Sequence, residues 1–212
     1  GMELCPALGI SIPVGKDSMS MKSSWGDNEV KSPVSLIVTA FSECPDVTKT
    51  ASPELLPDED FILLYVDLGN ENYRMGGSIA EQVNQIITND APDLDDPELF
   101  KNTSMVLQSL LKNRMIKAYH DRSDGGLVAL LLEMAFAGRC GLDIDLSAID
   151  NELSKILFSE ELGFVIQIHN EDAENIISAF KQKKVQNIYK IGTANKSNQI
   201  NIKHHDMNLS DD

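Results

Sequence analysis

Residues 116–138 read IKAYHDRSDGGLVALLLEMAFAG and combine an apolar strand, a polar turn and an apolar helix. Residues 116–119 are short and apolar enough for a strand, and residues 127–136 have the length of a buried helix that Gly138 ends. The turn between them, residues 120–126, holds two carboxylates, one hydroxyl and two glycines. A strand that passes through a tight turn into a helix predicts a mixed α/β domain.

Strand and helix patterns continue on both sides of this segment. Further strands are predicted at residues 61–66, 142–146, 163–168, 188–191 and 200–202, with helices after Ser78, after Pro97 and over residues 171–183. We expect an α/β sandwich with a sheet on one side and helices on the other. The polar tail from Lys203 is expected to fray.

The first fifty residues have a different pattern. Residues 8–14 and 35–41 predict apolar strands, residues 23–32 predict a polar loop, and residues 46–60, with two prolines and five acids, predict a domain linker. No helix is predicted to cover these strands. Because a sheet with an uncovered apolar face and open edges is unstable, we expect a piece of a longer chain or a domain completed by a partner.

Charge and composition exclude several classes of function. The formal net charge of −15 argues against a non-specific grip on nucleic acid, although Mg²⁺ and local donors can still hold a small phosphorylated ligand. No apolar run reaches the ~20 residues that span a bilayer. The three cysteines lie far apart without a C-x-x-C pair, which predicts reduced thiols in a cytosolic protein rather than disulfides or a zinc site.

The turn at residues 120–126 is the strongest candidate site. Asp121, Ser123 and Asp124 offer oxygen atoms of the kind that Mg²⁺ binds together with phosphate oxygens and water. Gly125 and Gly126 allow close approach of the backbone, and the start of the next helix offers N–H groups to an anion. The alternative is an ordinary capped helix, with Ser123 or Asp124 as the N-cap.

A second candidate is Gly15-Lys16-Asp17-Ser18, which follows a predicted strand. It is not a Walker A loop, because Ile10 and Asp17 stand where that pattern needs Gly and Ser or Thr. Lys16 can still contact a phosphate as a point charge, and the alternative is a surface turn.

The remaining polar groups are weaker candidates. Glu160 and Glu161 precede a buried strand and either coordinate a ligand or are simply solvated. The turn Gly76-Gly77-Ser78 is expected to cap a helix. His169 and the pair His204-His205 lack ligand spacing and are expected at the surface. No Ser/His/Asp or Cys/His set can be assembled from the sequence.

Four stretches, in this order and spacing, resemble the large, single-chain form of the phosphoribosylformylglycinamidine (FGAM) synthase family. They are residues 7–22 (ALGISIPVGKDSMSMK), 32–42 (SPVSLIVTAFS), 118–141 (AYHDRSDGGLVALLLEMAFAGRCG) and 157–168 (LFSEELGFVIQI). GKDSMSMK together with HDRSDGG is specific, whereas HDxSDGG alone is shared across the aminoimidazole-ribonucleotide (AIR) synthetase-like superfamily.

The resemblance implies a fragment of an ATP- and glutamine-dependent ligase of purine biosynthesis, with Mg²⁺ and ATP or ADP as cofactors. Residues 4–50 would be the last strands of a second AIR-synthetase N-like domain, 51–205 the second C-like α/β domain, and 206–212 a tail. The partners would be the rest of the parent chain, namely a first AIR-synthetase-like half and a glutaminase domain. The fragment is expected to be cytoplasmic and to be inactive alone. It is also expected to bind Mg-ATP weakly or not at all.

The resemblance also implies roles for individual residues, none of them catalytic. Asp121 resembles a Mg²⁺ ligand of the family's auxiliary nucleotide site, with Ser123, Asp124 and Gly125 as nucleotide contacts. The family's catalytic nucleotide and substrate would face a loop formed by Gly15, Lys16 and Ser18, although the smaller family form has Asn in place of Lys16.

Two alternatives remain open. One is a non-catalytic, nucleotide-binding structural module. The other is a different superfamily member, such as a selenophosphate synthetase or a hydrogenase-maturation protein, against which the GKDSMSMK loop argues.

Overall fold

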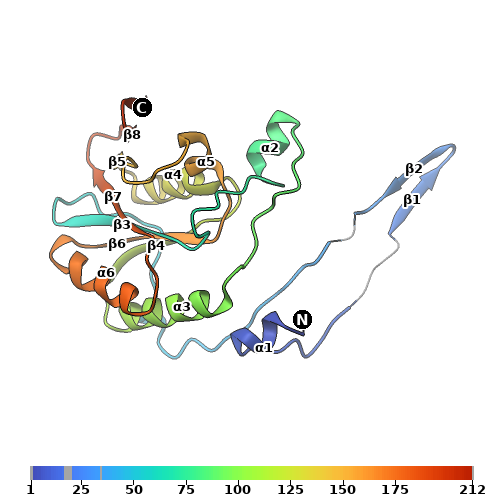
Figure 1. Ribbon diagram of the computed structural model, residues 1–212, viewed down its shortest axis with the longest axis horizontal. Helices are drawn as coiled ribbons and strands as arrows, with labels where there is room; N and C mark the ends of the chain where they lie inside the picture. The colour runs from blue at the N-terminus through green and yellow to red at the C-terminus, as the bar shows by residue number, and fades with distance from the viewer. Residues whose placement is uncertain (1, 17–20, 34, 212) are drawn as a thin grey trace. The chain divides into compact units, whose positions relative to one another are not determined.

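The computed structural model describes residues 2–16, 21–33 and 35–211 (Figure 1). The chain divides into two compact units, Gly1–Val47 and Thr48–Asp212, and each is described by itself. We call them unit 1 and unit 2. Within the described residues, no helix is long and apolar enough to cross a membrane.

The strands expected at residues 8–14 and 35–41 are absent from the described part of unit 1. Its first element is the short helix α1 (Leu4–Leu8), which ends at Gly9 with φ 74°. In the second segment Ile37 and Phe41 are 90% and 93% exposed. An apolar strand needs neighbours to pair its backbone and cover its side chains, and the described part of unit 1 supplies only a small hairpin.

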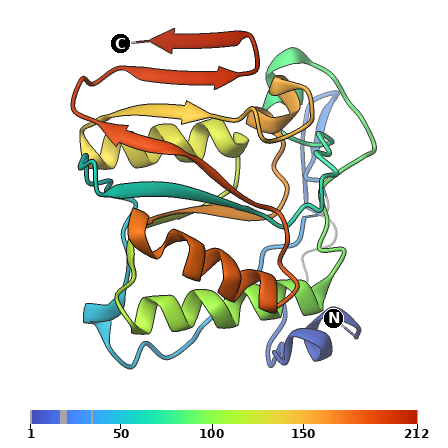
Figure 2. The same ribbon diagram turned by 60° about the vertical axis from the view of Figure 1, so that its left-hand side comes forward.

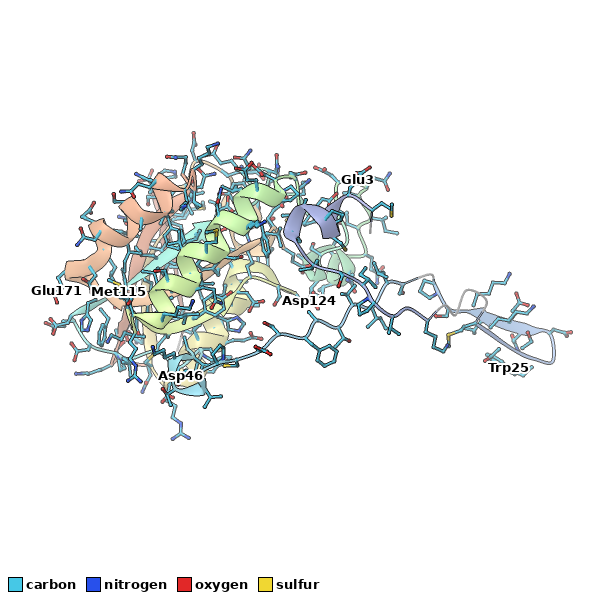
Figure 3. The ribbon with its side chains drawn as sticks, turned by 90° about the horizontal axis from the view of Figure 1, so that it is seen from below. Glu3, Trp25, Asp46, Met115, Asp124 and Glu171 are labelled. Atoms are coloured by element: carbon cyan, nitrogen blue, oxygen red, sulfur yellow. The ribbon has the colours of Figure 1, made fainter. Side chains whose placement is uncertain are left out.

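That hairpin lies where a polar loop was expected. Strands β1 (Lys22–Trp25) and β2 (Asn28–Lys31) pair antiparallel across the two-residue turn Gly26-Asp27, with Gly26 at φ 55°. Figure 3 labels Trp25 at the end of β1. The missed signal was the Gly-Asp pair, which is a known two-residue hairpin turn.

Unit 2 is built on a seven-stranded sheet with the order β4-β6-β3-β7-β5-β8-β9. Its pairs are antiparallel except for the parallel pair β5–β8. The strands are β3 (Phe61–Asp67), β4 (Ile116–Asp121), β5 (Gly141–Asp145), β6 (Gly163–His169), β7 (Ile188–Asn195), β8 (Ile200–His204) and β9 (Met207–Asp211).

Helices cover both faces of this sheet (Figure 2). They are α3 (Pro97–Lys112), α4 (Gly126–Gly138), α5 (Leu153–Phe158) and α6 (Ala173–Gln182), whereas the short helix α2 (Ile79–Asn84) contributes to neither core. Short 3-10 turns lie at η1 (Val47–Lys49) and η2 (Asn170–Asp172). One core joins α4 and α5 to Leu63 and Tyr65 of β3, and the other joins α3 and α6 to Leu64 and Val66.

The mixed α/β class is therefore confirmed, but the expectation of helices on one side only is wrong. The physical reason is visible in β3, where Leu63, Leu64, Tyr65 and Val66 are all fully buried. A strand that is apolar at consecutive positions is buried on both faces and needs cover on both.

Local signals placed two helix starts correctly. Ser78 caps α2 by accepting from the Glu81 amide at 3.3 Å, and Asp96 caps α3 by accepting from the Leu99 amide at 2.9 Å. Both bonds satisfy amides that have no partner inside the helix.

Two predicted polar segments are more ordered than expected. The tail forms strand β9, which pairs with β8 across the turn His205-Asp206. Part of the predicted linker packs on unit 2: Leu55 is 1% exposed, and the Ser52 carbonyl accepts from the Tyr119 amide at 2.9 Å. Backbone pairing explains the order of the tail, and the segment around Leu55 is held both by the Ser52–Tyr119 bond and by burial of Leu55 in the core of α4 and α5.

Candidate functional site

The turn at residues 120–126 joins the end of β4 to the start of α4, and Arg122 holds it against the sheet. The Arg122 side chain is fully buried and its Nη2 donates to Asp67 Oδ1 at 2.7 Å and to the Leu162 carbonyl at 3.0 Å. It also donates to the Tyr65 hydroxyl and the Glu161 carbonyl. The turn is thus fixed to the end of β3 and to the segment before β6.

The charges in this cluster support one another. Burial opposes the charged form of Arg122, but Tyr65 and Asp67 outweigh it and raise the pKa of the guanidinium. Burial raises the pKa of Tyr65 well above its usual range. Arg122 therefore stays charged, and its loss would leave Asp67 as an unpaired buried carboxylate.

The candidate ligands lie on the opposite side of the turn from Arg122. Asp121, Ser123 and Asp124 are exposed, and the side chain of Asp121 is 66% accessible (Asp124 is labelled in Figure 3). Within the described residues, the side chains of Ser123 and Asp124 make no hydrogen bond or ion pair. The turn therefore presents two carboxylates and a hydroxyl to solvent.

The alternative of a side-chain cap is wrong for this helix. The N-cap of α4 is Gly125, at φ 86° and ψ −5°, and it makes no side-chain cap bond. The Gly125 amide instead donates to Oε1 of Glu160 at 2.8 Å. Neither Ser123 nor Asp124 is used to cap the helix.

His120 fixes the entry to the turn. Its Nε2 lies 2.7 Å from Oε2 of Glu133 on α4, and its Nδ1 lies 2.8 Å from the Asp121 carbonyl oxygen. The ring therefore ties the end of β4 to the middle of α4, beside Asp121.

Glu161 is not solvated, contrary to the simpler expectation for the Glu160-Glu161 pair. It is fully buried, and its carboxylate accepts from Arg74 Nε at 2.5 Å and Nη2 at 2.9 Å. Arg74 also pairs with Asp95 at 2.8 Å, and hydrogen bonds to Glu161 and then Asp95 raise its pKa. This network fastens the loops on the two sides of α2 to the segment that precedes β6.

The second candidate loop lies in unit 1. Gly15 and Lys16 are exposed, and a Cβ atom added to Gly15 would meet nothing within 4 Å. Asp17 and Ser18 lie outside the described residues. The structure thus adds no local geometry to the proposed role of Gly15, Lys16 and Ser18.

One histidine expected at the surface is buried. His204 is 3% exposed, and its Nε2 lies 3.2 Å from the Ile149 carbonyl oxygen, whereas His205 is exposed. His169 is half-buried, with its ring centroid 4.6 Å from that of Phe61. The reason is the alternation of side chains along β8, because His204 lies two residues after the buried Ile202 and faces the same side of the sheet.

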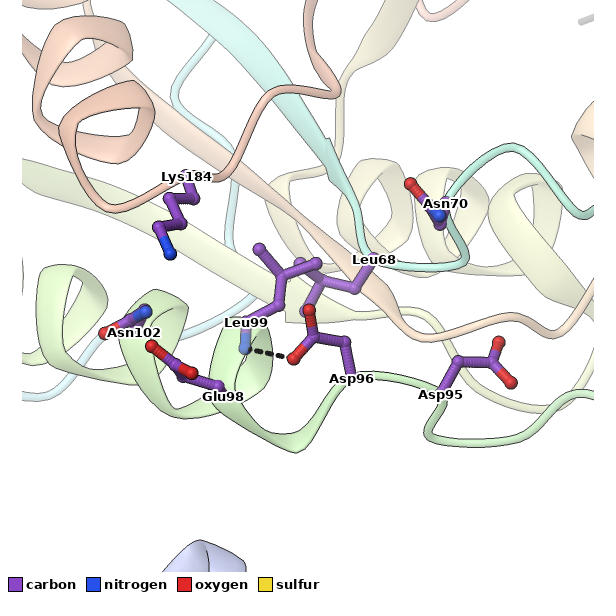
Figure 4. A pocket seen from close by; sticks show the side chains of 8 residues that line it. All are labelled: Leu68, Asn70, Asp95, Asp96, Glu98, Leu99, Asn102 and Lys184. Carbon is purple, nitrogen blue, oxygen red and sulfur yellow. Dashed lines mark hydrogen bonds between the residues drawn. The ribbon is translucent and has the colours of Figure 1, made fainter.

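A small acidic pocket lies elsewhere in unit 2 (Figure 4). Its volume is about 200 Å³, and it is lined by Leu68, Asn70, Asp95, Asp96, Glu98, Leu99, Asn102 and Lys184. That volume is below the range usual for ligand pockets. None of the predicted site residues lines it, and Asp96 is engaged in capping α3.

The exposed oxygens of the turn fit Mg²⁺ in part. Mg²⁺ usually takes one or two protein carboxylates and completes its shell with water and substrate phosphates. Over residues 2–16, 21–33 and 35–211, no group of three or more His, Cys, Asp or Glu side chains is placed to hold a metal ion. Asp121 can therefore supply one ligand, and a phosphate or another part of a protein must supply others.

The sequence did not reveal the roles of the buried Arg122 and Asp67 or of the half-buried Arg74, and it named Glu161 without showing that it is buried in an ion pair. The one usable signal was Arg122 itself, a cation between two acids in a turn that follows a buried strand. Its partner Asp67 lies 55 residues away in sequence, and only the pairing of β3, β4 and β6 brings them together.

Comparison with known protein families shows the family to which this chain belongs. A sequence model of the AIR synthase-related protein, C-terminal domain family matches residues 64–205. The chain therefore belongs to that family. A model of the FGAR-AT PurM_N-like domain matches residues 1–43.

Solved structures agree on the fold. Thermotoga maritima PurL complexed with FGAR is 12% identical with a TM-score of 0.70, covering 98% of this chain and 35% of that one. T. maritima PurL complexed with ATP is 12% identical with a TM-score of 0.59, covering 77% and 26%. Escherichia coli HypE, a hydrogenase maturation protein, is 20% identical with a TM-score of 0.53, covering 77% and 52%.

Together with the family models, these matches confirm the resemblance to the FGAM synthase family seen in the sequence. The chain spans about a third or less of the length of the PurL chains it matches.

Proposed function

We propose that this chain is one part of an ATP- and glutamine-dependent ligase that converts formylglycinamide ribonucleotide (FGAR) to the amidine in purine biosynthesis. The observation that carries the proposal is the order of two family matches in one chain, FGAR-AT PurM_N-like at residues 1–43 and AIR synthase C-terminal at residues 64–205. Residues 4–50 would end a second N-like domain, and residues 51–205 would form the second C-like domain, with 206–212 as a short extension.

The proposed partners are a first AIR-synthetase-like half and a glutaminase domain, within one cytoplasmic polypeptide. The chain alone is then expected to make no amidine from FGAR, ATP and ammonia, and to show no glutaminase activity. Ammonia-dependent amidine formation by the purified 212-residue chain would contradict the proposal.

Within this function, we assign the turn at residues 120–126 to an auxiliary Mg-nucleotide site. Asp121 would bind Mg²⁺, Ser123 and Asp124 would contact the nucleotide, and Gly125 would allow close approach of the backbone. What supports this is the exposure of the three side chains and the absence of internal partners for Ser123 and Asp124 within the described residues. Bound Mg²⁺ would neutralise phosphate charge beside these acids.

Gly15, Lys16 and Ser18 would form a loop facing the catalytic nucleotide and substrate. One experiment on the complete polypeptide distinguishes the roles of the two loops. Lys16→Ala is expected to abolish turnover and leave folding intact, whereas Asp121→Asn is expected to release nucleotide and lower the melting temperature. A ligand at 100 times its Kd adds about 2.7 kcal/mol of stability, so the second effect is measurable by calorimetry.

The second candidate is a nucleotide-binding structural module, or another superfamily member. Its support is the likeness in fold to HypE, which covers 77% of this chain. Asp121→Asn would then change stability, and Lys16→Ala would change nothing.

A further inference from the structure

Glu160 lies between the starts of two helices. Its Oε1 accepts from the Gly125 amide at 2.8 Å and from the Ile79 amide, also at 2.8 Å. Gly125 is the N-cap of α4, and Ile79 is the first residue of α2. One carboxylate oxygen therefore joins the turn at residues 120–126 to the turn Gly76-Gly77-Ser78.

The backbone around Glu160 fits closely against both turns. A Cβ atom on Gly126 would lie 2.6 Å from the Leu157 carbonyl oxygen. On the other side, the Ser159 hydroxyl donates to the Arg74 carbonyl at 3.0 Å. Glu160 therefore lies on a segment whose neighbours contact Gly126 on one side and Arg74, just before the Gly76–Ser78 turn, on the other.

This arrangement changes how a phosphate can approach. Helix α4 has no side-chain cap of its own, and the Glu160 carboxylate provides the negative charge that a helix N-terminus favours. The Gly125 amide is therefore already bonded. A ligand that binds the exposed face of the turn would contact Asp121, Ser123 and Asp124, whereas Glu160 is already bonded to the Gly125 amide.

We propose that Glu160 is a positioning residue that couples the Gly76–Ser78 turn and α2 to the 120–126 turn, so that a Mg-nucleotide bound at Asp121 and Ser123 also orders the start of α2. This role rests on the proposed function of the 120–126 turn. Its neighbour Glu161 has a different task, because it is fully buried in an ion pair with Arg74.

Three variants test the role. Glu160→Gln keeps a side-chain oxygen that accepts from both amides, whereas Glu160→Ala removes it. Glu59→Ala is the matched control, since Glu59 is an exposed acid in a loop and its side chain makes no hydrogen bond or ion pair to any described residue. The measurement is hydrogen exchange of single amides by NMR in the 212-residue chain without ligand.

In Glu160→Ala, exchange at both Ile79 and Gly125 is expected to accelerate roughly tenfold, as loss of a charge-assisted hydrogen bond predicts. Glu160→Gln should restore most of the protection, and Glu59→Ala should change neither amide. Unchanged exchange at either amide, or uniform acceleration over the whole chain without excess at these two, overturns the proposal.

A second experiment uses Mg-ADP as the probe in the complete polypeptide, where the proposed partner domains are present, and follows exchange by mass spectrometry. In the wild-type chain, exchange should slow at residues 121–125 and also at Ile79, and in Glu160→Ala only at residues 121–125. Protection at 121–125 without any at Ile79 in the wild-type chain overturns the role of Glu160 alone. No protection at 121–125 removes the proposed nucleotide site as well.

Discussion

Units 1 and 2 are both rich in apolar residues but use them in opposite ways. Unit 1 exposes Ile10, Ile12, Val14, Leu36, Ile37, Val38 and Phe41. Unit 2 buries its apolar residues in two cores, one on each face of the sheet. An apolar pattern therefore reports what a segment can pair with, and only a partner within reach turns it into a buried strand.

The same contrast holds for charge. In unit 1, Glu29 pairs with Lys22 and Lys31, and all three side chains are largely exposed. In unit 2, Arg122 and Asp67 are buried together beneath the candidate site. Ion pairs of the first kind add little stability, whereas breaking one of the second kind leaves an uncompensated buried charge.

The largest expected effect is therefore at Arg122. Arg122→Met should lower the free energy of unfolding by about 3–5 kcal/mol, and Lys22→Met by at most about 1 kcal/mol. Urea unfolding of the chain measures both. If Arg122→Met does not fold, the double variant with Asp67→Asn should recover part of the loss, because it removes the unpaired charge. Equal effects of the two single variants would contradict the difference between buried and exposed ion pairs.

The next effect is in the core. Leu131 is fully buried on α4, and Leu131→Ala should cost about 2–5 kcal/mol through lost burial and a residual cavity. Ile37, which is 90% exposed, is the matched residue in unit 1, and Ile37→Ala should change the free energy of unfolding by less than about 0.5 kcal/mol. A cost at Ile37 similar to that at Leu131 would mean that residues 35–41 are covered in solution.

Deletion of unit 1 tests whether unit 2 is stable without it. Removing residues 1–47 should leave unit 2 folded, because the two cores lie within residues 48–212. The melting temperature should move by no more than about 4 °C, which corresponds to roughly 1 kcal/mol for a domain of this size. Loss of a cooperative transition in calorimetry would show that unit 2 depends on unit 1.

The smallest expected effect concerns pH. Hydrogen bonds from Ser147, followed by Lys203, lower the pKa of Asp145 from 3.8 to about 2. Because the folded-state pKa is depressed, the stabilisation is complete above pH 3.8 and is lost as the pH falls toward about 2. Asp145 is about half exposed, so the contribution should stay below about 1 kcal/mol.

Melting temperatures of the wild-type chain and Asp145→Asn test this contribution. Their difference should be constant above pH 3.8 and shrink below it. A difference that grows as the pH falls would have the wrong sign.

The sequence predicted local features of unit 2 well. Signals within a few residues, such as Ser78 and Asp96 before their helices, located the helix starts because capping is a local interaction. The sequence also located the exposed turn with Asp121, Ser123 and Asp124. It did not reveal the second helix layer, although the consecutive apolar residues of β3 contained that information.

What could not be predicted depends on contacts between distant segments. Arg122 with Asp67, and Arg74 with Glu161, meet only after the sheet has formed. The prediction of strands in unit 1 was wrong because no segment that could pair with them is found among the described residues. In both cases the missing information was which segments become neighbours.

We propose that the turn at residues 120–126 presents Asp121 and Ser123 as part of a Mg-nucleotide site. Mn²⁺-ADP in place of Mg²⁺-ADP tests it directly, because the paramagnetic ion broadens NMR signals of nearby amides. We expect broadening centred on residues 121–124 that Asp121→Asn abolishes. Broadening centred on the acidic pocket at Asp95, Asp96 and Glu98, or spread evenly over the acidic surface, would contradict the claim.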